Sequence, residues 1–369
     1  MANLSTEAGG ARSARTLFWL AIFVAGLAGW TVCAVTADAE RAWRALLVSF
    51  IYFTPLAAGM VVWPAAVIGS RGRWAKTIEQ PALAGIAFAP VSLLTFAALW
   101  FGRGHWAGWM RYKHLPNAAW LNATFLFTRD GVALMVLWAL AAWFVVRRQR
   151  GRPVALACGV AFAYCVVFTL LGFDMVMGLD PHWFSALFGG YFFVSGLYAA
   201  LAAWTLIVAL RSTAPDKERL HDLGKLMVAF SLLTAYMMFS QLLPLWYENL
   251  PNEVRYVVPR LSFERWGWVS AALLAVIYLG PLAILLTRWS KRTPKFLATV
   301  ALAVLVGLWV ERWWLVTPTL GGAPVIGWTE ASITAAFAAA LALGIECFLR
   351  SAPPVVNETE EPAAAEETA

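Results

Sequence analysis

The chain has 369 residues, of which 61% are hydrophobic and only 13% are charged, and its mean hydropathy is +0.68. Soluble domains contain about 45–50% apolar residues, so this composition excludes a soluble globular protein and indicates an integral membrane protein. The net charge of +7 does not call for a nucleic acid partner, because basic residues of membrane proteins accumulate in cytoplasmic loops.

Ten apolar stretches follow one another along the chain, and each is close to the roughly 20 residues that a helix needs to cross a bilayer. Their uninterrupted apolar character excludes a β-barrel, whose strands alternate between apolar and polar residues. The fold class is therefore predicted to be all-α. The predicted spans are residues 16–36, 45–68, 82–101, 124–146, 154–177, 183–210, 223–247, 266–287, 295–316 and 328–349.

The distribution of Lys and Arg predicts the orientation of these spans. If the N-terminus is inside, the inner segments hold 18 of the 28 basic residues and the outer segments hold 9. An excess of Lys and Arg marks cytoplasmic loops, so both termini are expected in the cytoplasm. The first apolar stretch lacks a small-residue cleavage site and is interpreted as a membrane anchor.

Two short segments recur in the sequence with the same offset. Tyr-Phe at 52–53 recurs at 191–192, and Ser-Leu-Leu-Thr at 92–95 recurs at 231–234, both 139 residues later. An offset that covers four spans predicts two tandem, parallel four-helix bundles with a flanking helix at each end. The predicted division is 1–44, 45–180 (first bundle), 181–320 (second bundle), 321–350 (tenth helix) and 351–369 (a disordered acidic tail).

Three polar residues at the outer ends of the fifth and sixth spans are the main candidates for function. Asp174 ends the fifth span, and Asp180 and His182 follow in the short turn. Polar and charged groups at membrane depth are costly and mark sites by default. Two carboxylates and an imidazole can relay protons near neutral pH. Asp180 before Pro181 also predicts a cap for the sixth helix.

Further charged residues are expected to support that cluster or to supply it with protons. Arg129 and Asp130 are about 100° apart around a helix, so each is expected to find its partner on another helix. Arg44, Glu311 and Arg312 flank the same outer face. Purely structural ion pairs are the alternative for each. In the inner half, Glu346 and Lys225 are the candidates for proton uptake.

No motif for a metal or a covalently bound cofactor occurs in the chain. Its four His lie in loops or at helix ends, whereas a transmembrane haem b generally needs axial His within helices. There is no CxxCH, cysteine cluster, Walker loop or zinc motif. Any redox metal of a larger assembly is therefore expected in other polypeptides.

Four blocks of sequence, in order between about residues 40 and 320, resemble one family of membrane subunits. They are "AWRALLVSFIYFT", "FDMVMGLDPHWFSALFGGYFFVSG", "HDLGKLMVAFSLLTAYMMFSQLLPLWYENLP" and "GLWVERWWLVTPTL". The family is the ActF-type subunit of alternative complex III, a quinol:cytochrome c oxidoreductase, which is related to the NrfD and polysulfide reductase membrane subunits. Met175 and Leu242 replace aromatic residues of the family pattern, which predicts a thinner aromatic wall for a quinone ring.

The resemblance implies a subunit of a quinol-oxidising respiratory complex in a bacterial inner membrane. Quinol is the expected ligand, and iron–sulfur clusters and c-type haems would lie in partner subunits that pass electrons to cytochrome c or a terminal oxidase. The implied partners are a paralogous membrane subunit, an iron–sulfur subunit, multi-haem cytochrome c subunits and membrane lipid. Two alternatives stay open: a proton-conducting or scaffolding subunit without a quinone site, and a stand-alone secondary transporter.

Overall fold

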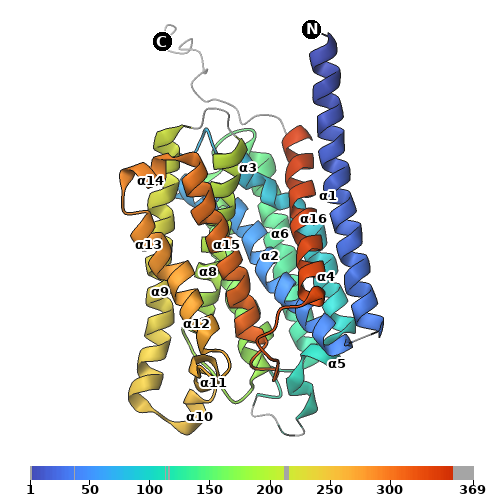
Figure 1. Cartoon of the computed structure of the whole chain (residues 1–369), viewed down its shortest axis with the longest axis vertical. Helices are drawn as coiled ribbons and strands as arrows, with labels where there is room; N and C mark the ends of the chain where they lie inside the picture. The colour runs from blue at the N-terminus through green and yellow to red at the C-terminus, as the bar shows by residue number, and fades with distance from the viewer. Residues whose placement is uncertain (1, 37, 113, 115–116, 212–215, 352–369) are drawn as a thin grey trace, which may run out of the picture.

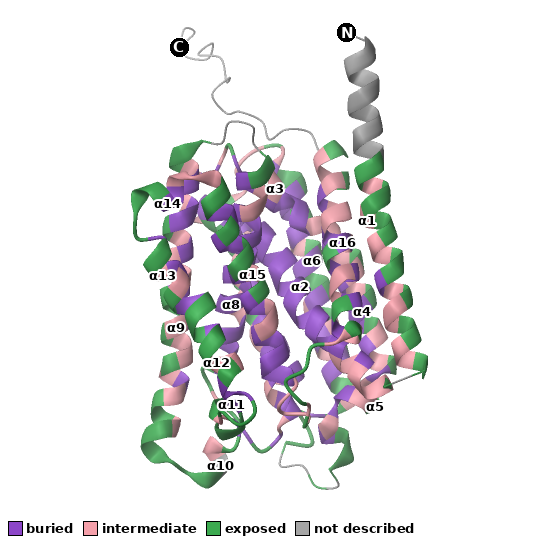
Figure 2. Cartoon of the chain, in the orientation of Figure 1, coloured by how far each residue is buried: buried purple, intermediate pink, exposed green. Residues whose placement is uncertain are grey.

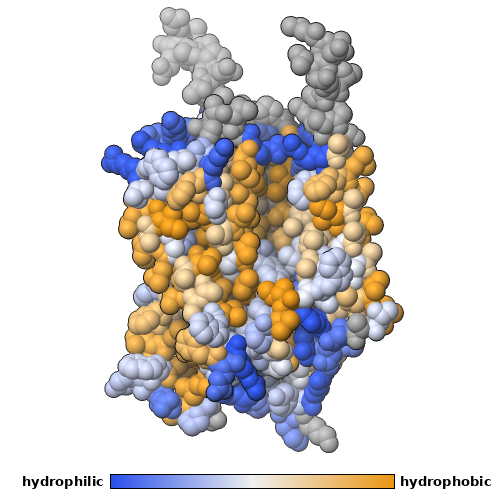
Figure 3. All heavy atoms as spheres, viewed as in Figure 1, coloured by the Kyte–Doolittle hydropathy of each residue, from blue (hydrophilic) through white to orange (hydrophobic). Residues whose placement is uncertain are grey.

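The computed structural model describes residues 2–36, 38–112, 114, 117–211 and 216–351, and every regular element in these ranges is helical. Ten helical segments are long and apolar enough to cross a bilayer, which confirms the predicted all-α membrane fold. The helices stand side by side (Figure 1), with an apolar band around the middle and hydrophilic residues gathered at both ends (Figure 3).

Eight spans consist of one long helix each. These are α1 (Ala2–Thr36), α2 (Ala39–Gly69), α6 (Ala123–Arg148), α7 (Val154–Met175), α8 (Phe188–Arg211), α9 (Lys217–Glu248), α15 (Pro294–Val316) and α16 (Trp328–Ser351). The beginning of α1 and the end of α16 lie at the same end of the molecule (Figure 1). This end is called the terminal end below, and the sequence predicts that it is cytoplasmic.

Two spans change helix type along their length. The third consists of α3 (Gln80–Leu83), the 3₁₀-helix η1 (Ala84–Phe88) and α4 (Ala89–Phe101), and the eighth consists of α12 (Gly267–Leu273), the π-helix η4 (Leu274–Leu279) and α13 (Gly280–Ile284). Short helices in the connections are α5 (Arg103–Trp106), η2 (Gly108–Arg111), η3 (Met177–Leu179), α10 (Pro251–Val254), α11 (Val258–Leu261) and α14 (Arg288–Arg292).

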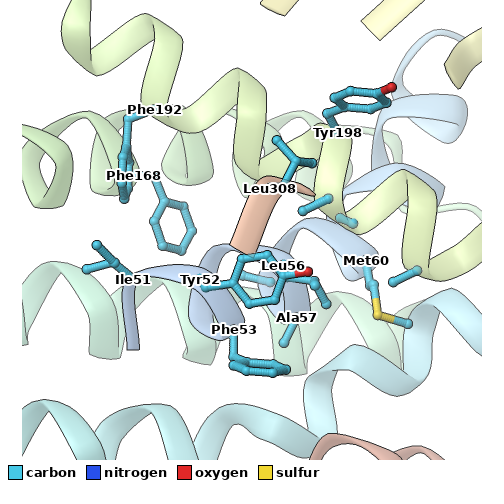
Figure 4. Packing of buried hydrophobic residues seen from close by; sticks show 14 of the residues in the cluster. Ile51, Tyr52, Phe53, Leu56, Ala57, Met60, Phe168, Phe192, Tyr198 and Leu308 are labelled. Carbon is cyan, nitrogen blue, oxygen red and sulfur yellow. The ribbon is translucent and has the colours of Figure 1, made fainter. Parts of the chain in front are cut away.

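Helices α2 and α8 form the centre of the molecule. The most apolar 18-residue window of α2 is completely buried, as expected for a helix that is apolar on all sides. Figure 2 shows this buried centre, with exposed residues on the outer faces of the surrounding helices. Side chains of α2, α7, α8 and α15 gather there, among them Phe53, Phe168, Phe192 and Leu308 (Figure 4).

Glycines allow α2 and α8 to approach closely. A Cβ atom at Gly196 would lie 2.6 Å from the Tyr164 hydroxyl oxygen and 2.9 Å from Pro55 Cβ, and one at Gly59 would lie 2.8 Å from Ala200 Cβ. Small residues at helix crossings are the usual device for tight packing in membranes. The Tyr164 hydroxyl also donates a hydrogen bond of 3.1 Å to the Pro55 carbonyl, which fixes α7 against this crossing.

The packing of the helices follows the 139-residue offset. That offset relates α2 to α8 and α7 to α15. Helix α7 contacts both α2 and α8, and α15 likewise contacts both α8 and α2. This pattern supports the interpretation of a tandem repeat, while the division into domains stays a prediction. Helices α1 and α16 pack on each other, and α16 also contacts α2 and η1, so both flank the first predicted bundle.

Two boundaries differ from those predicted. Helix α2 begins at Ala39, so the boundary at residue 45 falls inside it. Helix α8 begins at Phe188, not at residue 183, and the predicted cap by Asp180 is wrong. Asp180 instead accepts a hydrogen bond of 3.2 Å from the His182 backbone N–H within the turn. Residues 352–369 of the predicted acidic tail lie outside the described residues.

Candidate functional site

Arg129 joins two carboxylates at the end of the first predicted bundle that lies away from the terminal end. Its Nη2 lies 2.5 Å from Asp174 Oδ2 on α7, and its Nε lies 3.3 Å from Asp130 Oδ1. Asp130 and Asp174 are both fully buried. The expectation that Arg129 would find its partner on another helix is correct for Asp174, but the expectation that it would not pair with Asp130 is wrong. A long, flexible guanidinium side chain reaches across the 100° between neighbouring positions.

Aromatic rings cover this cluster. The indole N–H of Trp120 donates a hydrogen bond of 2.7 Å to Asp174 Oδ1. The Arg129 guanidinium lies 3.8 Å from the centre of the Trp120 ring and 4.7 Å from that of Phe125. Both carboxylate oxygens of Asp174 therefore have donors, and the cation that neutralises them is stacked between rings. Such an arrangement is typical of a structural ion pair that joins two helices.

Asp180 and His182 have partners other than Asp174. Asp180 Oδ2 lies 3.2 Å from Arg255 Nε, which belongs to the connection between α9 and α12. The His182 side chain is exposed, and its ring meets that of Tyr112 edge to face at 5.4 Å. The predicted three-residue cluster is therefore distributed over two neighbourhoods, in which Asp174 is enclosed and His182 faces the outside.

The remaining candidates from the sequence form separate pairs. At the outer end, Arg44 Nη2 lies 2.8 Å from Glu40 Oε2. At the terminal end, Glu346 lies 3.2 Å from Arg350, and Lys225 Nζ lies 3.1 Å from Asp222 Oδ1. Lys225 pairs within α9, whereas Glu346 on α16 also lies 3.8 Å from Arg15 on α1.

Glu311 and Arg312 are buried together near the C-terminal end of α15. Their side chains are 1% and 2% exposed, and Arg312 Nη1 lies 3.5 Å from Glu311 Oε2. Arg312 Nη2 donates to Ser195 Oγ at 2.7 Å and to the Phe192 carbonyl at 3.1 Å. Among the described residues, neither oxygen of Glu311 has a hydrogen-bond partner. A buried carboxylate without donors is costly, so this position is not explained by stability.

Glu311 lies in the wall of a cavity of about 170 Å³ between α9, the eighth span and α15. The cavity is largely apolar, with leucines from several elements between its aromatic rings. Its aromatic walls are Trp183, Phe188, Tyr191, Tyr256, Tyr278 and Trp314. Trp183 and Tyr256 are stacked with ring centres 3.8 Å apart. Leu242, from which a thinner aromatic wall was predicted, lines this cavity together with rings from other elements.

The π-helix η4 shapes one side of this cavity. Tyr278 lies in η4, and its hydroxyl is 3.3 Å from that of Tyr191 on α8. The carbonyl of Tyr278 accepts a hydrogen bond of 3.4 Å from Ser231 on α9. Single π-turns inside α-helices are frequent at functional sites. Here the π-helix places the Tyr278 phenol in the cavity wall, and the Tyr278 carbonyl bonds to a side chain of the neighbouring helix α9.

A second buried charge, Arg260, also lies in the wall of the cavity. Its guanidinium donates to the carbonyls of Tyr256 and Leu315 and to Thr319 Oγ1, and it lies 3.5 Å from the Tyr256 ring centre. Burial lowers the pKa of Arg260 from its ordinary value, although a guanidinium stays protonated at neutral pH. Arg260 and Glu311 thus give the cavity one cation and one carboxylate.

The cavity reaches the lateral surface of the helices in the half of the molecule away from the terminal end. Glu311 is five residues from the end of α15 at Val316, a distance of about 8 Å at 1.5 Å per residue. Leu261 and Leu274 line the cavity, and each is 51% exposed. An apolar ligand could therefore enter from the lipid without passing through water.

Sequence reasoning missed most of this cavity. Tyr256, Arg260 and Tyr278 were not singled out, and Glu311 was assigned only a supporting role. The available signal was a carboxylate and an arginine within an apolar, Trp-rich helix, "WVERWW". A charged residue within a membrane helix that has no opposite charge three or four residues away indicates a functional site more strongly than a charged residue in a turn does.

Comparison with known protein families and with curated proteins gives no significant match for this chain. Within the described residues, no group of three or more His, Cys, Asp or Glu could hold a metal ion. The haem and iron–sulfur centres expected in partner subunits stay a prediction. What the structure establishes is a multi-pass helical membrane protein with a carboxylate-bearing aromatic cavity.

Proposed function

We propose that this chain is a membrane subunit of a quinol-oxidising respiratory complex, and that the cavity beside Glu311 receives the quinol ring. The observation that carries the proposal is a buried carboxylate with no hydrogen-bond donor on either oxygen, in the wall of an aromatic cavity. The sequence resemblance to the ActF-type subunit of alternative complex III supplies the reaction class.

The cavity fits one flat ring with an apolar tail. Its volume of about 170 Å³ is below the roughly 300–1,000 Å³ of sites that enclose a drug-sized molecule, so a headgroup enters and a tail stays outside. Aromatic walls contact the faces of such a ring. The tail would leave past the exposed Leu261 and Leu274 into the bilayer.

Glu311 is the proposed proton acceptor. Oxidation of a quinol to a quinone releases two protons and two electrons. In each of two one-electron steps, a quinol hydroxyl would give its proton to the Glu311 carboxylate. A redox centre of a partner subunit, an iron–sulfur cluster or a c-type haem, would accept the electron. Glu311 must lose its proton between the two steps. Arg312, whose Nη1 lies 3.5 Å from Glu311 Oε2, favours the ionised form of this carboxylate against the effect of burial.

Asp180 is proposed to pass protons outward. Asp180 directly precedes Pro181 and lies three residues before Trp183, which is in the cavity wall. Its side chain is 12% exposed and lies beside Arg255. Its charge acts on both Tyr256 and Arg260, so it is electrostatically close to the cavity. Asp174, enclosed by Arg129 and Trp120, is proposed to hold helices together.

The two alternatives receive less support from the packing. The direct link from Glu346 to Asp174 is α2, which contacts both α16 and α7 but is buried and mostly apolar from Phe50 to Ile68. For a transporter, broken helices at matched repeat positions would be expected. The two composite spans here are the third and the eighth, which the 139-residue offset does not relate to each other.

Purification from native membranes through a tag on this chain tests the assignment first. Mass spectrometry should find haem c and iron–sulfur subunits and a paralogous membrane subunit with it. Recovery of the chain alone would contradict the respiratory assignment. Solute uptake by the purified chain in vesicles would favour the transporter.

In the assembled complex, Glu311→Gln should lower quinol-dependent electron transfer by about 10²-fold or more, the usual contribution of a general base. Glu40→Gln is the matched control, because Glu40 is an acid at the same membrane end, paired with Arg44 and Arg111 outside the cavity. It should leave turnover unchanged. Wild-type turnover of Glu311→Gln in a fully assembled complex would exclude the proposed base.

A further inference from the structure

Two adjoining cavities at the terminal end carry an excess of positive charge. One has a volume of about 280 Å³ and includes Arg73, Lys76, Arg148, Arg152 and Glu79 in its lining. The other, of about 450 Å³, includes Arg147, Arg150 and the same Arg152. The two cavities therefore meet at Arg152, between the loop after α2 and the loop after α6.

Hydrogen bonds hold this site in shape without a ligand. Arg148 is 3% exposed, and its Nη2 donates to Glu79 Oε1 at 2.7 Å while its Nη1 donates to the Gly151 carbonyl at 2.9 Å. Arg152 Nη2 donates to the Gly72 carbonyl at 2.7 Å. The loops that carry the cations are thus tied to each other and to a buried ion pair.

One carboxylate stands against six cations. Burial raises the pKa of Glu79 above its ordinary value, even though Arg148 contacts it. Counting only the residues described by the structure, the other five cations form no ion pair within 4.0 Å; they are Arg73, Lys76, Arg147, Arg150 and Arg152. The site is therefore complementary to an anion that carries more than one negative charge.

Apolar side chains next to these cavities indicate that the anion belongs to a lipid. Trp143 and Val154 line the second cavity and are 54% and 39% exposed, and Val146 beside them is 50% exposed. Phosphate-binding side chains and exposed apolar side chains thus adjoin at the membrane boundary. A soluble anion would contact only the phosphate-binding side chains and not the exposed apolar ones.

We propose that these cavities bind an anionic phospholipid, with a preference for diphosphatidylglycerol. One phosphodiester would lie in each cavity, and Arg152 would contact both. Acyl chains would extend along Trp143 and Val154 into the bilayer. Basic pockets between transmembrane helices on the cytoplasmic side are the setting in which such headgroups bind. The inference does not depend on the quinol proposal.

Native mass spectrometry of the full-length chain with defined lipids tests the inference. Wild type should bind diphosphatidylglycerol more tightly than phosphatidylglycerol, and phosphatidylcholine least. Arg150→Gln and Arg152→Gln should each weaken diphosphatidylglycerol binding roughly fivefold, the effect of one basic residue on an anionic headgroup. Arg265→Gln, an exposed residue at the opposite end, is the matched control and should change nothing.

Three results would overturn the inference. The first is equal binding of diphosphatidylglycerol to wild type and to both variants. The second is equal affinity for phosphatidylglycerol and diphosphatidylglycerol, which would exclude the two-phosphate arrangement. The third is displacement of the lipid by millimolar inorganic phosphate, which would assign the cavities to a soluble anion. If Arg152→Gln fails to fold, Lys76→Gln tests the first cavity without disturbing the contact to Gly72.

Discussion

Asp174 on α7 and Glu311 on α15 are two buried acids in comparable places with different surroundings. The 139-residue offset relates their helices, and Glu311 stands two residues before the position equivalent to Asp174. Asp174 accepts hydrogen bonds from Arg129 and Trp120. Glu311 accepts none among the described residues and faces a cavity. The comparison teaches that burial of an acid does not reveal its role, whereas the donors around it do.

The largest effect on stability is expected from removing Arg129, the cation that pairs with Asp130 and Asp174. Arg129→Met leaves Asp130 and Asp174 buried with no cation between them, and an uncompensated buried charge costs about 3–5 kcal/mol. Thermal unfolding of the purified chain in detergent should show a large loss of stability. The triple variant with Asp130→Asn and Asp174→Asn as well should recover much of it.

Arg265→Met, at an exposed arginine, is the control for Arg129→Met and should unfold like wild type. If Arg129→Met also unfolded like wild type, the ion pair would not be structural. The contrast with the Glu311 cavity would then have to be abandoned.

An intermediate effect on stability is expected when Asp174 and Glu311 are each replaced by the corresponding amide, and the two replacements should differ. In Asp174→Asn, whichever way the amide turns, its NH₂ faces a donor, either the Trp120 N–H or the Arg129 guanidinium. The loss of a charge-assisted hydrogen bond costs about 2 kcal/mol. In Glu311→Gln, the amide oxygen can turn toward Arg312 and no hydrogen bond is lost, so stability should change by less than about 1 kcal/mol.

Thermal unfolding of both amide variants under one condition measures this difference. Electron transfer should show the reverse order, with Glu311→Gln as the more damaging change per assembled complex. Equal losses of stability for the two variants would show that Glu311 has donors of its own, and the cavity would lose its proposed base.

The sequence alone predicted the ten spans and the all-α fold, because long apolar runs have few alternatives in a bilayer. It also predicted that Arg129 supports the cluster that contains Asp174 and pairs with a residue on another helix. It could not predict the cavity, because Trp183, Tyr256 and Tyr278 come from a turn, a loop and a π-helix. Spacing along one chain does not say which distant segments meet, and a π-helix has no simple sequence signature.

The smallest effect is expected at the edge of the cavity. Tyr278→Phe removes a hydroxyl that pairs with the Tyr191 hydroxyl at 3.3 Å, and one such neutral hydrogen bond contributes about 0.5–1.5 kcal/mol. Because Tyr278 lines the cavity and its hydroxyl is proposed to donate to a quinone oxygen, affinity for a quinone analogue should fall roughly 2- to 10-fold, as measured by quenching of tryptophan fluorescence.

Tyr198→Phe is the matched control for this edge. The Tyr198 hydroxyl is also buried and donates to the Ile277 carbonyl at 3.2 Å, but Tyr198 is not part of the cavity wall. Its loss should lower stability slightly and leave analogue affinity unchanged. Equal loss of affinity in both variants would mean that the phenols act by fixing the eighth span against α8 and that the Tyr278 hydroxyl does not contact the quinone ring.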